Sequence, residues 1–364
     1  MKTKVPAPLD KIARPLLRWF RARARSLPWR DDPRPYYVWV SEIMLQQTRV
    51  AAVMPYFTRF VAALPDVASL AAADDDALMK LWEGLGYYSR ARNLKKAANL
   101  IMEEHGGVVP KDFDALLKLP GVGRYTAGAI SSIAYGLRTP AVDGNVLRVV
   151  ARLTASREDI LRDKTKRAVE DDLAAVMPKE AGQFNQAMME LGALVCLPRA
   201  ARCDECPLAA LCRAHAAGLE AELPVKSPKK ERRVEARTVL LIEQDGRFAI
   251  AKRPRRGLLA GLWEFPNFAG EKNRAEILAI CKNAGLSPKS VRRMKAARHI
   301  FTHIEWNLSG WHIRLSDAPK ESLREPRSVY AASPLPPLTW ATQKELSDTY
   351  SIPAAFQAYA PKNA

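Results

Sequence analysis

Apolar positions recur with helical spacing through the first two thirds of the chain. Near the N-terminus they share one face, with Arg and Lys opposite, at Leu9, Ile12, Leu16, Trp19 and Phe20. The same spacing predicts further helices over residues 75–84, 90–106, 112–119, 124–136, 146–155, 165–176 and 184–196. Several of these segments begin at Asp or Thr and end at Gly, as helix caps require. The pattern predicts an all-α domain over residues 1–225.

A second domain follows a stretch rich in charge and proline. That stretch covers residues 226–236 and predicts an exposed linker. Beyond it, short apolar runs replace the helical pattern, apart from one helix predicted over residues 274–284. We therefore expect a multidomain protein, with a smaller α+β domain over residues 237–364.

Two hairpin signals lie in this second domain. Asp245-Gly246 separates the apolar runs 238–242 and 247–251, and Ser309-Gly310 separates the runs 304–308 and 311–315. Such dipeptides suit the tight turns that join antiparallel strands. The sequence therefore predicts a hairpin at each place.

The charge of the chain bears on its partners. Its 364 residues include 57 Lys and Arg against 39 Asp and Glu, a formal net charge of +18, and residues 226–364 hold 25 of the basic and 13 of the acidic side chains. This excess favours a polyanion, because Lys and Arg release counterions when they neutralise phosphates. The chain has neither an apolar run of the ~20 residues that cross a bilayer nor the apolar start of a signal peptide. We expect a cytoplasmic protein that binds no membrane.

Four cysteines give the sharpest local signal. Cys196, Cys203, Cys206 and Cys212 lie close together in the sequence, and four thiolates at such spacing can hold zinc or a [4Fe-4S] cluster. Zinc ribbons usually present two Cys-x2-Cys pairs, whereas this segment has one, so the spacing favours the cluster. Cys281 lies far away, on the predicted helix 274–284, and is interpreted as a small core residue.

A glycine-rich turn joins two predicted helices, in the sequence LPGVGRYTAGAI at residues 119–130. Gly121 and Gly123 leave backbone amides bare at the start of the second helix, where they can point at a phosphate. A plain helical hairpin is the alternative. The basic domain around the turn, and the sequence VDGNV at residues 142–146, favour contact with a nucleic-acid backbone.

Together, the hairpin, the aspartate about twenty residues beyond it and the cysteine cluster resemble the helix-hairpin-helix DNA glycosylases that carry an iron-sulfur cluster. Within that superfamily, three motifs are similar to those of the adenine glycosylase (MutY) family. They are WVSEIMLQQT at residues 39–48, LWEGLGYYSRARN at 81–93 and FNQAMMELG at 184–192. The resemblance runs from about residue 28 to residue 212.

The resemblance implies a fold, an activity and a cofactor. It implies a six-helix lobe and a cluster-bearing lobe, with a [4Fe-4S] cluster on the four cysteines. The implied enzyme is a monomeric hydrolase of base excision repair, whose substrate is duplex DNA with adenine opposite 8-oxoguanine or, more weakly, opposite guanine. A monovalent cation at the helix-hairpin-helix is a further candidate, and no nucleotide cofactor is expected.

Glycosidic cleavage needs an acid for the leaving base and a negative group for the sugar cation. Glu42 lies in an otherwise apolar helical stretch, where desolvation would keep it protonated, although a partly exposed helix glutamate is the alternative. The resemblance assigns it protonation of adenine at N7. Asp143 would cap the helix that starts near Val146, and the resemblance also assigns it the sugar cation. Asn145 is expected to help orient this carboxylate or its phosphate neighbour.

Tyr125 indicates what the enzyme does not do. Relatives that also cut the DNA strand carry at this place a lysine whose amine forms a Schiff base with the sugar. A phenol cannot form that bond, so the resemblance implies a monofunctional glycosylase. Tyr125 is expected to contact the catalytic carboxylates or the sugar, and a purely packing role is the alternative.

Extraction of a base from the duplex requires side chains that fill the gap and read the exposed edges. Suitable wedges and edge readers are Gln46, Gln47, Leu85 and Tyr87, and Tyr87 matches the family tyrosine that inserts beside the lesion guanine. Gln186 matches a position that lines the adenine pocket, with helix surface as the alternative.

The C-terminal domain resembles a Nudix fold in architecture only. The sequence GLLAGLWEFP at residues 257–266 is retained, but the segment 274–284 offers only Glu276 as an acid, too few to hold magnesium. In the family, a Phe-Ser-His loop of this domain recognises 8-oxoguanine. Phe301, Thr302 and His303 match it with Thr for Ser, which keeps the hydroxyl group; a loop histidine without this role is the alternative for His303.

Two other classes of function remain open from the sequence. One is a Nudix-type nucleotide hydrolase with an accessory DNA domain, which the missing acids disfavour. The other is a DNA-binding protein without activity, in which hairpin and cluster are only a scaffold. The glycosylase reading requires Glu42 and Asp143 to face one pocket.

Overall fold

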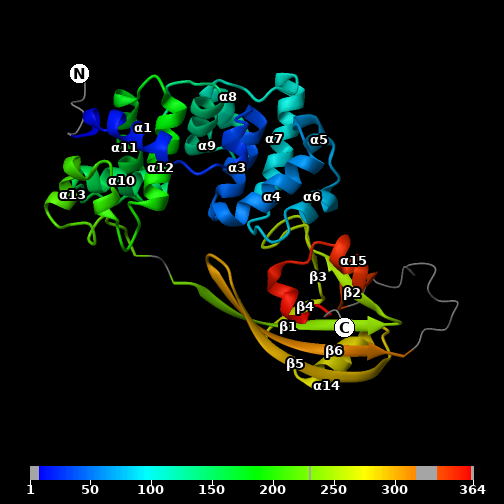
Figure 1. Ribbon diagram of the computed structural model, residues 1–364. Helices are drawn as coiled ribbons and strands as arrows, with labels where there is room; N and C mark the ends of the chain where they lie inside the picture. The colour runs from blue at the N-terminus through cyan, green and yellow to red at the C-terminus, as the bar shows by residue number, and fades with distance from the viewer. Residues whose placement is uncertain (1–7, 229–230, 317–333, 362–364) are drawn as a thin grey trace. The chain divides into compact units, whose positions relative to one another are not determined.

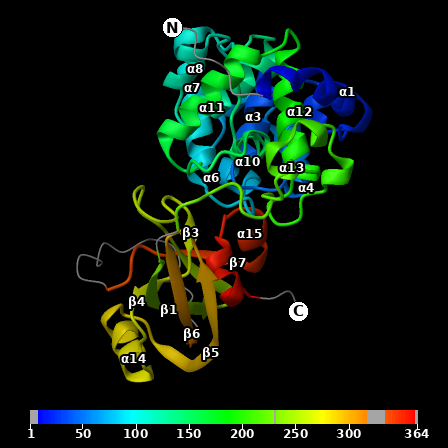
Figure 2. The ribbon, with the colours of Figure 1, turned by 90° about the vertical axis from the view of Figure 1, so that its left-hand side faces the viewer.

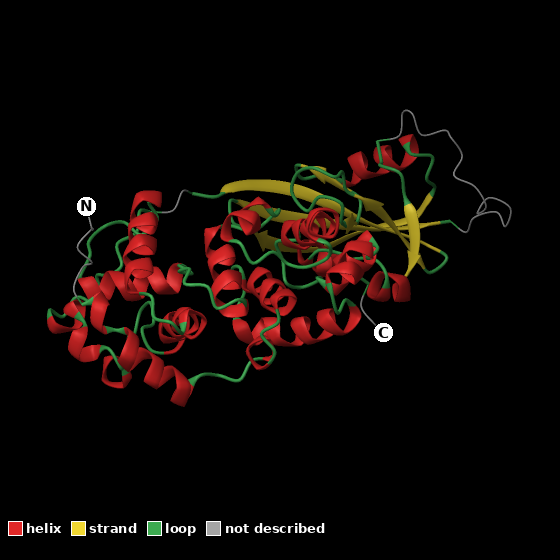
Figure 3. Cartoon of the chain, turned by 90° about the horizontal axis from the view of Figure 1, so that it is seen from above, coloured by secondary structure: helices red, strands yellow, loops and turns green. Residues whose placement is uncertain are grey.

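The chain forms two compact units in the computed structural model, which describes residues 8–228, 231–316 and 334–361 (Figure 1). The first unit comprises residues 1–73 and 89–228, and the second comprises residues 74–88 and 229–364. The strands, yellow in Figure 3, gather in one sheet, and the described part of the first unit has helices alone.

The first unit is all-α. Its helices are α1 (Ala13–Arg23), α2 (Pro28–Asp31), α3 (Pro35–Leu45), α4 (Val50–Ala63), α5 (Val67–Ala72), α7 (Ser89–His105), α8 (Phe113–Lys118), α9 (Arg124–Ala129), α10 (Gly144–Thr154), α11 (Asp163–Val176), α12 (Ala181–Leu194) and α13 (Arg213–Ala216). A π-helical turn, Ile130–Ala134, continues α9, and the 3-10 turns Leu9–Lys11, Cys203–Glu205 and Ala209–Leu211 complete the unit.

One apolar core holds α1, α10, α11 and α12 together. Leu16 and Phe20 of α1 pack with Val149 of α10, Leu173 of α11 and Phe184 of α12, all of them buried. Burial of this apolar surface stabilises the arrangement. The apolar face predicted near the N-terminus therefore does become part of a core.

The second unit is built on a mixed sheet. Its strands are β1 (Arg233–Gln244), β2 (Arg247–Lys252), β3 (Trp263–Glu264), β4 (Asn267–Ala269), β5 (Pro288–Ile300), β6 (Ile304–Leu315) and β7 (Thr339–Thr342). The order along the sheet is β3-β2-β1-β6-β5, with β4 beside β1 and β7 beside β2. Strands β1 and β6 run parallel, whereas β5 and β6 are antiparallel.

Helices cover both faces of this sheet (Figure 2). Ile277 and Cys281 of α14 (Arg274–Asn283) pack on one face, so Cys281 is a core residue as expected. The other face packs against Leu346 of α15 (Gln343–Asp348) and Phe356 of the 3-10 turn Ala354–Tyr359. Alternate residues of β1 and β2 therefore enter two separate apolar cores.

The segment 74–88 belongs to the sheet unit. Its helix α6 (Asp75–Leu81) contributes Asp76, whose carboxylate accepts hydrogen bonds from Lys252 Nζ at 2.8 Å and from Trp263 Nε1 at 3.2 Å. Farther along the segment, Glu83 Oε1 accepts a hydrogen bond from the backbone N–H of Ile352 at 2.9 Å. These bonds fix α6 against the C-terminal fold.

One predicted hairpin is confirmed and the other is wrong. Asp245 and Gly246 have φ angles of 49° and 72° and form the turn between β1 and β2. Ser309 and Gly310, in contrast, lie inside the continuous strand β6. A Cβ atom at Gly310 would lie 2.2 Å from the ring of Tyr359, so this glycine makes room for a packed side chain and not for a turn. Strand β1 also begins at Arg233, within the stretch expected to be a linker.

Candidate active site

A cavity of about 890 Å³ opens in the helical unit. Seven of the residues that the sequence singled out line it, namely Glu42, Gln46, Gln47, Tyr125, Asp143, Asn145 and Gln186. They come from segments far apart in the sequence, so the fold itself brings them together. Glu42 and Asp143, the two carboxylates that the sequence predicts for glycosidic cleavage, thus line one cavity.

Glu42 lies on the last turn of α3 and is only 5% exposed. Burial raises the pKa of Glu42 to about 7, and the nearby charge of Asp143 acts in the same direction. The hydrogen bond from Tyr125 Oη to Glu42 Oε2, 2.5 Å long, and the charge of Arg30 oppose this rise. Glu42 therefore exchanges its proton near neutral pH, as a general acid requires.

Asp143 is the N-cap of α10. Its Oδ1 accepts hydrogen bonds from the backbone N–H groups of Asn145, at 2.9 Å, and Val146, at 2.8 Å, and its Oδ2 accepts one from Asn145 Nδ2 at 2.7 Å. Burial raises the pKa of Asp143, whereas these donors lower it because they stabilise the anion. The expected cap is present, and the same carboxylate also lines the cavity.

A second buried carboxylate in the cavity has the opposite electrostatic setting. Burial would raise the pKa of Glu190, but hydrogen bonds from Arg25 and Arg30 overcome it and lower that pKa to about 2. Arg25 Nη2 and Arg30 Nη2 lie 2.7 and 2.8 Å from Glu190 Oε2. Arg30 also donates to Gln186 Oε1 at 3.0 Å, which holds this side chain at the cavity wall.

Sequence reasoning missed Arg25, Arg30 and Glu190. Glu190 lies in the quoted motif at residues 184–192, four residues after Gln186 and therefore on the same helical face. That spacing is the signal that would have identified it. The two arginines stand at the edge of the resemblance, where the sequence offers no comparable spacing.

The four clustered cysteines follow α12 and are all free and half-buried. Cys206 and Cys212 are each close enough to Cys196 for its charge to raise their thiol pKa further, and burial is the largest cause in both cases. The buried Arg152 binds this segment: its Nη1 donates to Cys196 Sγ at 3.2 Å and to the carbonyl of Leu197 at 2.7 Å. Four soft sulfur donors beside a guanidinium suit a negatively charged iron-sulfur centre.

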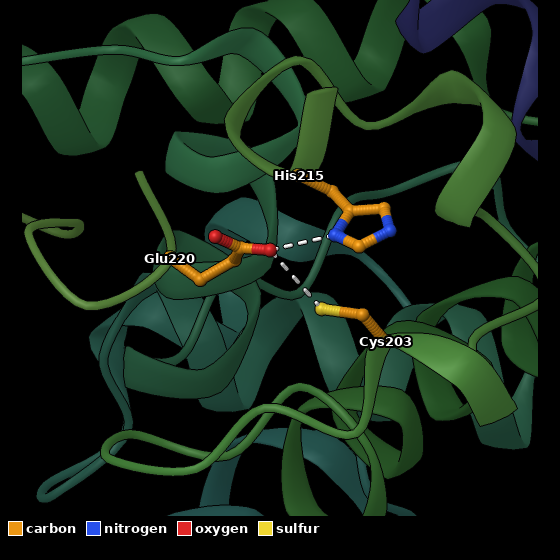
Figure 4. A group of neighbouring side chains, drawn as sticks. All are labelled: Cys203, His215 and Glu220. Atoms are coloured by element: carbon orange, nitrogen blue, oxygen red, sulfur yellow. Dashed lines mark hydrogen bonds and ion pairs between the residues drawn. The ribbon is translucent and has the colours of Figure 1, made fainter. Parts of the chain in front are cut away.

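Cys203 also belongs to a mixed group with His215 and Glu220 (Figure 4). Their potential ligand atoms lie within 4.8 Å of one another, with His215 Nδ1 2.6 Å and Cys203 Sγ 3.5 Å from Glu220 Oε1. Sulfur, nitrogen and oxygen donors together suit zinc. Cys203 cannot serve this group and the four-cysteine set at the same time.

The remaining residues predicted to contact DNA differ in their exposure, their backbone conformation and their position relative to the cavity. Leu85 is buried, at 6% exposure, whereas Tyr87 is 45% exposed. Gln47 and Tyr87 both have a left-handed backbone conformation, with φ of 58° and 47°. This conformation is strained for residues other than glycine, and such strain clusters at functional sites. Gly121 and Gly123 are exposed in the turn between α8 and α9, outside the cavity.

The predicted lesion-reading loop is the tight turn between β5 and β6. The backbone N–H of Phe301 donates to the carbonyl of Ile304 at 2.8 Å, and the Phe301 ring packs edge-on against Trp306, with 4.9 Å between ring centroids. Thr302 and His303 are exposed. Thr302 Oγ1 lies 3.0 Å from Tyr87 Oη, so two separately predicted DNA contacts share a hydrogen bond.

The acid on α14 has a structural partner. Glu276 forms a capping box with Asn273 at the start of the helix, and its Oε1 lies 3.1 Å from Lys272 Nζ. It is the only acid within α14. This helix therefore offers no magnesium site of the Nudix type.

Comparisons with known proteins agree with this geometry. The model of the HhH-GPD superfamily of base excision DNA repair proteins matches residues 40–179, and that of the NUDIX domain matches residues 237–361. The adenine DNA glycosylase of Rattus norvegicus is 34% identical over 97% of this chain and 78% of its own length. The chain belongs to the adenine DNA glycosylase family.

Other relatives support membership in the adenine DNA glycosylase family. The enzyme of that name from Buchnera aphidicola subsp. Acyrthosiphon pisum is 33% identical over 82% of this chain and 85% of its own. Among solved structures, a thermostable thymine-DNA glycosylase matches with a TM-score of 0.53 and 26% identity, over 57% of this chain and 97% of that chain. The resemblance drawn from the motifs and the fold class are confirmed.

Membership in the adenine DNA glycosylase family makes the protein a hydrolytic N-glycosylase of base excision repair that acts on DNA. Its donor set is compatible with the [4Fe-4S] cluster expected from the spacing. Across the residues that the structure describes, no helix has the length and apolar character that a bilayer crossing demands.

Proposed function

We propose that this protein is a monofunctional glycosylase that removes adenine from duplex DNA where it is mispaired with 8-oxoguanine and, more weakly, with guanine. One observation carries the proposal. Glu42, with a pKa of about 7, and Asp143, whose carboxylate accepts three N–H hydrogen bonds, line the same cavity.

Glu42 acts as the acid and Asp143 stabilises the cation. Glu42 donates its proton to a ring nitrogen of adenine, N7 by resemblance, and makes the base a better leaving group. As the glycosidic bond breaks, the carboxylate of Asp143 stabilises the positive sugar. Asn145 fixes the orientation of Asp143 through its side-chain amide. Gln186, held by Arg30, contributes to the pocket for the base.

The proposed reaction ends at an abasic site. Strand cleavage by the known route requires an amine that attacks the sugar. At the relevant place stands Tyr125, and among the described residues no lysine lines the cavity. Removal of the base therefore leaves the strand intact.

Cys196, Cys203, Cys206 and Cys212 would hold the [4Fe-4S] cluster. When bound, the cluster cross-links the segment after α12, and it supplies no reagent for hydrolysis. Arg152 donates to Cys196 Sγ and to the carbonyls of Leu197, Pro198, Glu220 and Leu223. This set of bonds joins both ends of the cysteine-rich segment to α10.

The turn between β5 and β6 would read the base opposite adenine. Its exposed Thr302 and His303 offer a hydroxyl and an imidazole, which can hydrogen-bond the edge of 8-oxoguanine. Tyr87 Oη lies 3.0 Å from the Thr302 hydroxyl oxygen. The ring of Tyr87 would insert into the duplex beside the lesion base. Gly121 and Gly123, with their backbone amides, would grip a phosphate.

The test uses duplexes with adenine opposite 8-oxoguanine or guanine and one with thymine glycol, followed by alkaline cleavage. We expect breaks only after alkali, and only in the two adenine duplexes. Glu42→Gln and Asp143→Asn should abolish excision and keep duplex binding. Near-normal single-turnover rates in either variant would contradict the role given to that residue.

A further inference from the structure

The hydroxyl of Tyr125 has two acceptors within reach. Besides Glu42 Oε2 at 2.5 Å, it lies 3.1 Å from the sulfur of Met189 on α12. A phenol carries one proton and can donate to only one of them at a time, while its oxygen can accept from the other side. The position of this proton therefore depends on whether Glu42 carries one.

The geometry allows two hydrogen-bond arrangements. When Glu42 is ionised, Tyr125 donates to Oε2, which is a strong, charge-assisted bond. When Glu42 is neutral and protonated at Oε2, it donates to the phenol oxygen, and the phenol proton turns to the thioether sulfur, a weak acceptor. The sulfur thus lets Tyr125 accept from a Glu42 that is protonated at Oε2, whereas a Glu42 protonated at Oε1 can still accept from Tyr125 at Oε2.

We propose that Met189 is a positioning residue for the acid, because its sulfur accepts the Tyr125 proton and lets neutral Glu42 donate to the phenol. This inference rests on the proposed role of Glu42. Met189 is half-buried and lines the cavity, where it is within reach of the Tyr125 hydroxyl. The sulfur supports the neutral form that must be present before the base leaves.

Other charged groups line the cavity with Glu42 and could also alter the pH dependence of excision, so a test must leave them unchanged. The charged and titratable groups that line the cavity with Glu42 and Tyr125 are Arg25, Arg30, Arg49, Asp143 and Glu190. Replacement of Met189 alters none of them directly. A change in the pH dependence of excision can then be attributed to the sulfur.

The decisive variant is Met189→Leu, which keeps an apolar side chain of similar volume and removes the acceptor. Single-turnover excision is measured against pH on a duplex with adenine opposite 8-oxoguanine. The variant loses the arrangement in which neutral Glu42 donates to the phenol. The alkaline limb, which is the fall of the excision rate at high pH, should therefore move to lower pH by about half a unit, and the rate at a given pH on that limb should fall about threefold. The rate on the acid plateau should stay close to that of the wild type.

The neighbouring methionine provides a matched control. Met188 is 1% exposed in the core of the helical unit and does not line the cavity, so Met188→Leu should leave the limb in place. Met189→Gln restores an acceptor through its amide oxygen and should return the limb to the wild-type pH or above it.

The outcomes separate this inference from the proposed function. If wild-type excision shows no alkaline limb, the role of Glu42 fails first. If the wild type shows the limb and Met189→Leu leaves it unmoved, or lowers the rate equally at every pH, the role of Met189 is overturned. The role of Met189 is supported if Met189→Leu moves the limb to lower pH and Met189→Gln returns it to the wild-type pH or above.

Discussion

Glu42 and Glu190 line one cavity, yet burial raises the pKa of Glu42 to about 7 whereas two arginines lower that of Glu190 to about 2. The difference lies in the partners. Glu42 has a phenol and little compensating charge, while Glu190 receives hydrogen bonds from Arg25 and Arg30. The cavity therefore holds a neutral acid and a permanent anion side by side, which separates proton donation from fixed electrostatics.

The first prediction concerns the pH dependence of excision. Because the proposed acid is the protonated form of Glu42, the single-turnover rate should be highest below pH 7 and fall about tenfold per unit well above it. Glu42→Gln cannot donate a proton and should show no such limb. A wild-type rate that rises steadily through pH 7 would contradict the assignment.

The second prediction concerns stability, and its sign follows from linkage. The pKa of Glu42 is about 7 in the folded protein against 4.5 ordinarily. Its contribution is therefore fully present below about pH 4.5 and is lost as the pH rises through 7. The difference in free energy of unfolding between Glu42→Gln and the wild type should therefore favour the variant more at pH 8.5 than at pH 5. The change between the two pH values should be on the order of 3 kcal/mol at most. Urea unfolding at the two pH values measures this.

Glu190→Gln is the control of opposite sign. The folded pKa of Glu190 is depressed, so its contribution is present above about pH 4.5 and is lost only as the pH falls toward 2. Its removal leaves Arg25 and Arg30 without their carboxylate and should destabilise the protein by about 3 kcal/mol at both pH 5 and pH 8.5. Equal behaviour of the two variants would show that the partners do not set the protonation states.

The third prediction tests the reading loop. Thr302→Val keeps the shape of the side chain and removes the hydroxyl that Tyr87 contacts. Excision opposite 8-oxoguanine should fall about fivefold, the worth of one hydrogen bond, with little change opposite guanine. Thr302→Ser keeps the hydroxyl and should preserve the ratio of the two rates. An unchanged ratio in the valine variant would remove Thr302 from lesion recognition.

The fourth prediction distinguishes the two donor sets that share Cys203. A four-cysteine cluster predicts that Cys203→Ala loses the broad visible absorption of iron and sulfur, whereas His215→Ala keeps it. A zinc site on Cys203, His215 and Glu220 instead predicts zinc in the purified protein and the loss of zinc in both variants. Metal analysis beside the absorption spectrum decides between them.

The sequence predicted most of the longer helices, but it predicted neither the bounds of α3 nor helix α4. The predicted segment 90–106 corresponds to α7, with the expected apolar face inward. Glu42 was placed in a helical stretch, but the bounds of α3 were not predicted because most of its residues are buried, so no polar face marks its period. Strand β5 was missed for the opposite reason. It is an edge strand whose basic side chains hide the alternation.

For the site, the sequence identified residues by type but could not supply their partners. Glu42 and Asp143 stood out because cleavage requires two acids, and the fold places both at one cavity. The hydrogen bonds from Arg30 to Gln186 and to Glu190 join residues more than 150 positions apart. Local spacing cannot report such tertiary bonds, and so the electrostatic setting of the pocket emerged only from the structure.

The double duty of Asp143 constrains how this enzyme can be altered. One carboxylate both caps α10 and lines the cavity in which the proposed reaction takes place, so loss of the side chain should weaken the start of the helix as well as abolish excision. Asparagine separates the two effects, because its amide oxygen can still accept from the backbone while the negative charge is lost. Under the proposed mechanism, a substitution at Asp143 that leaves no capping acceptor would therefore combine a folding defect with the loss of excision.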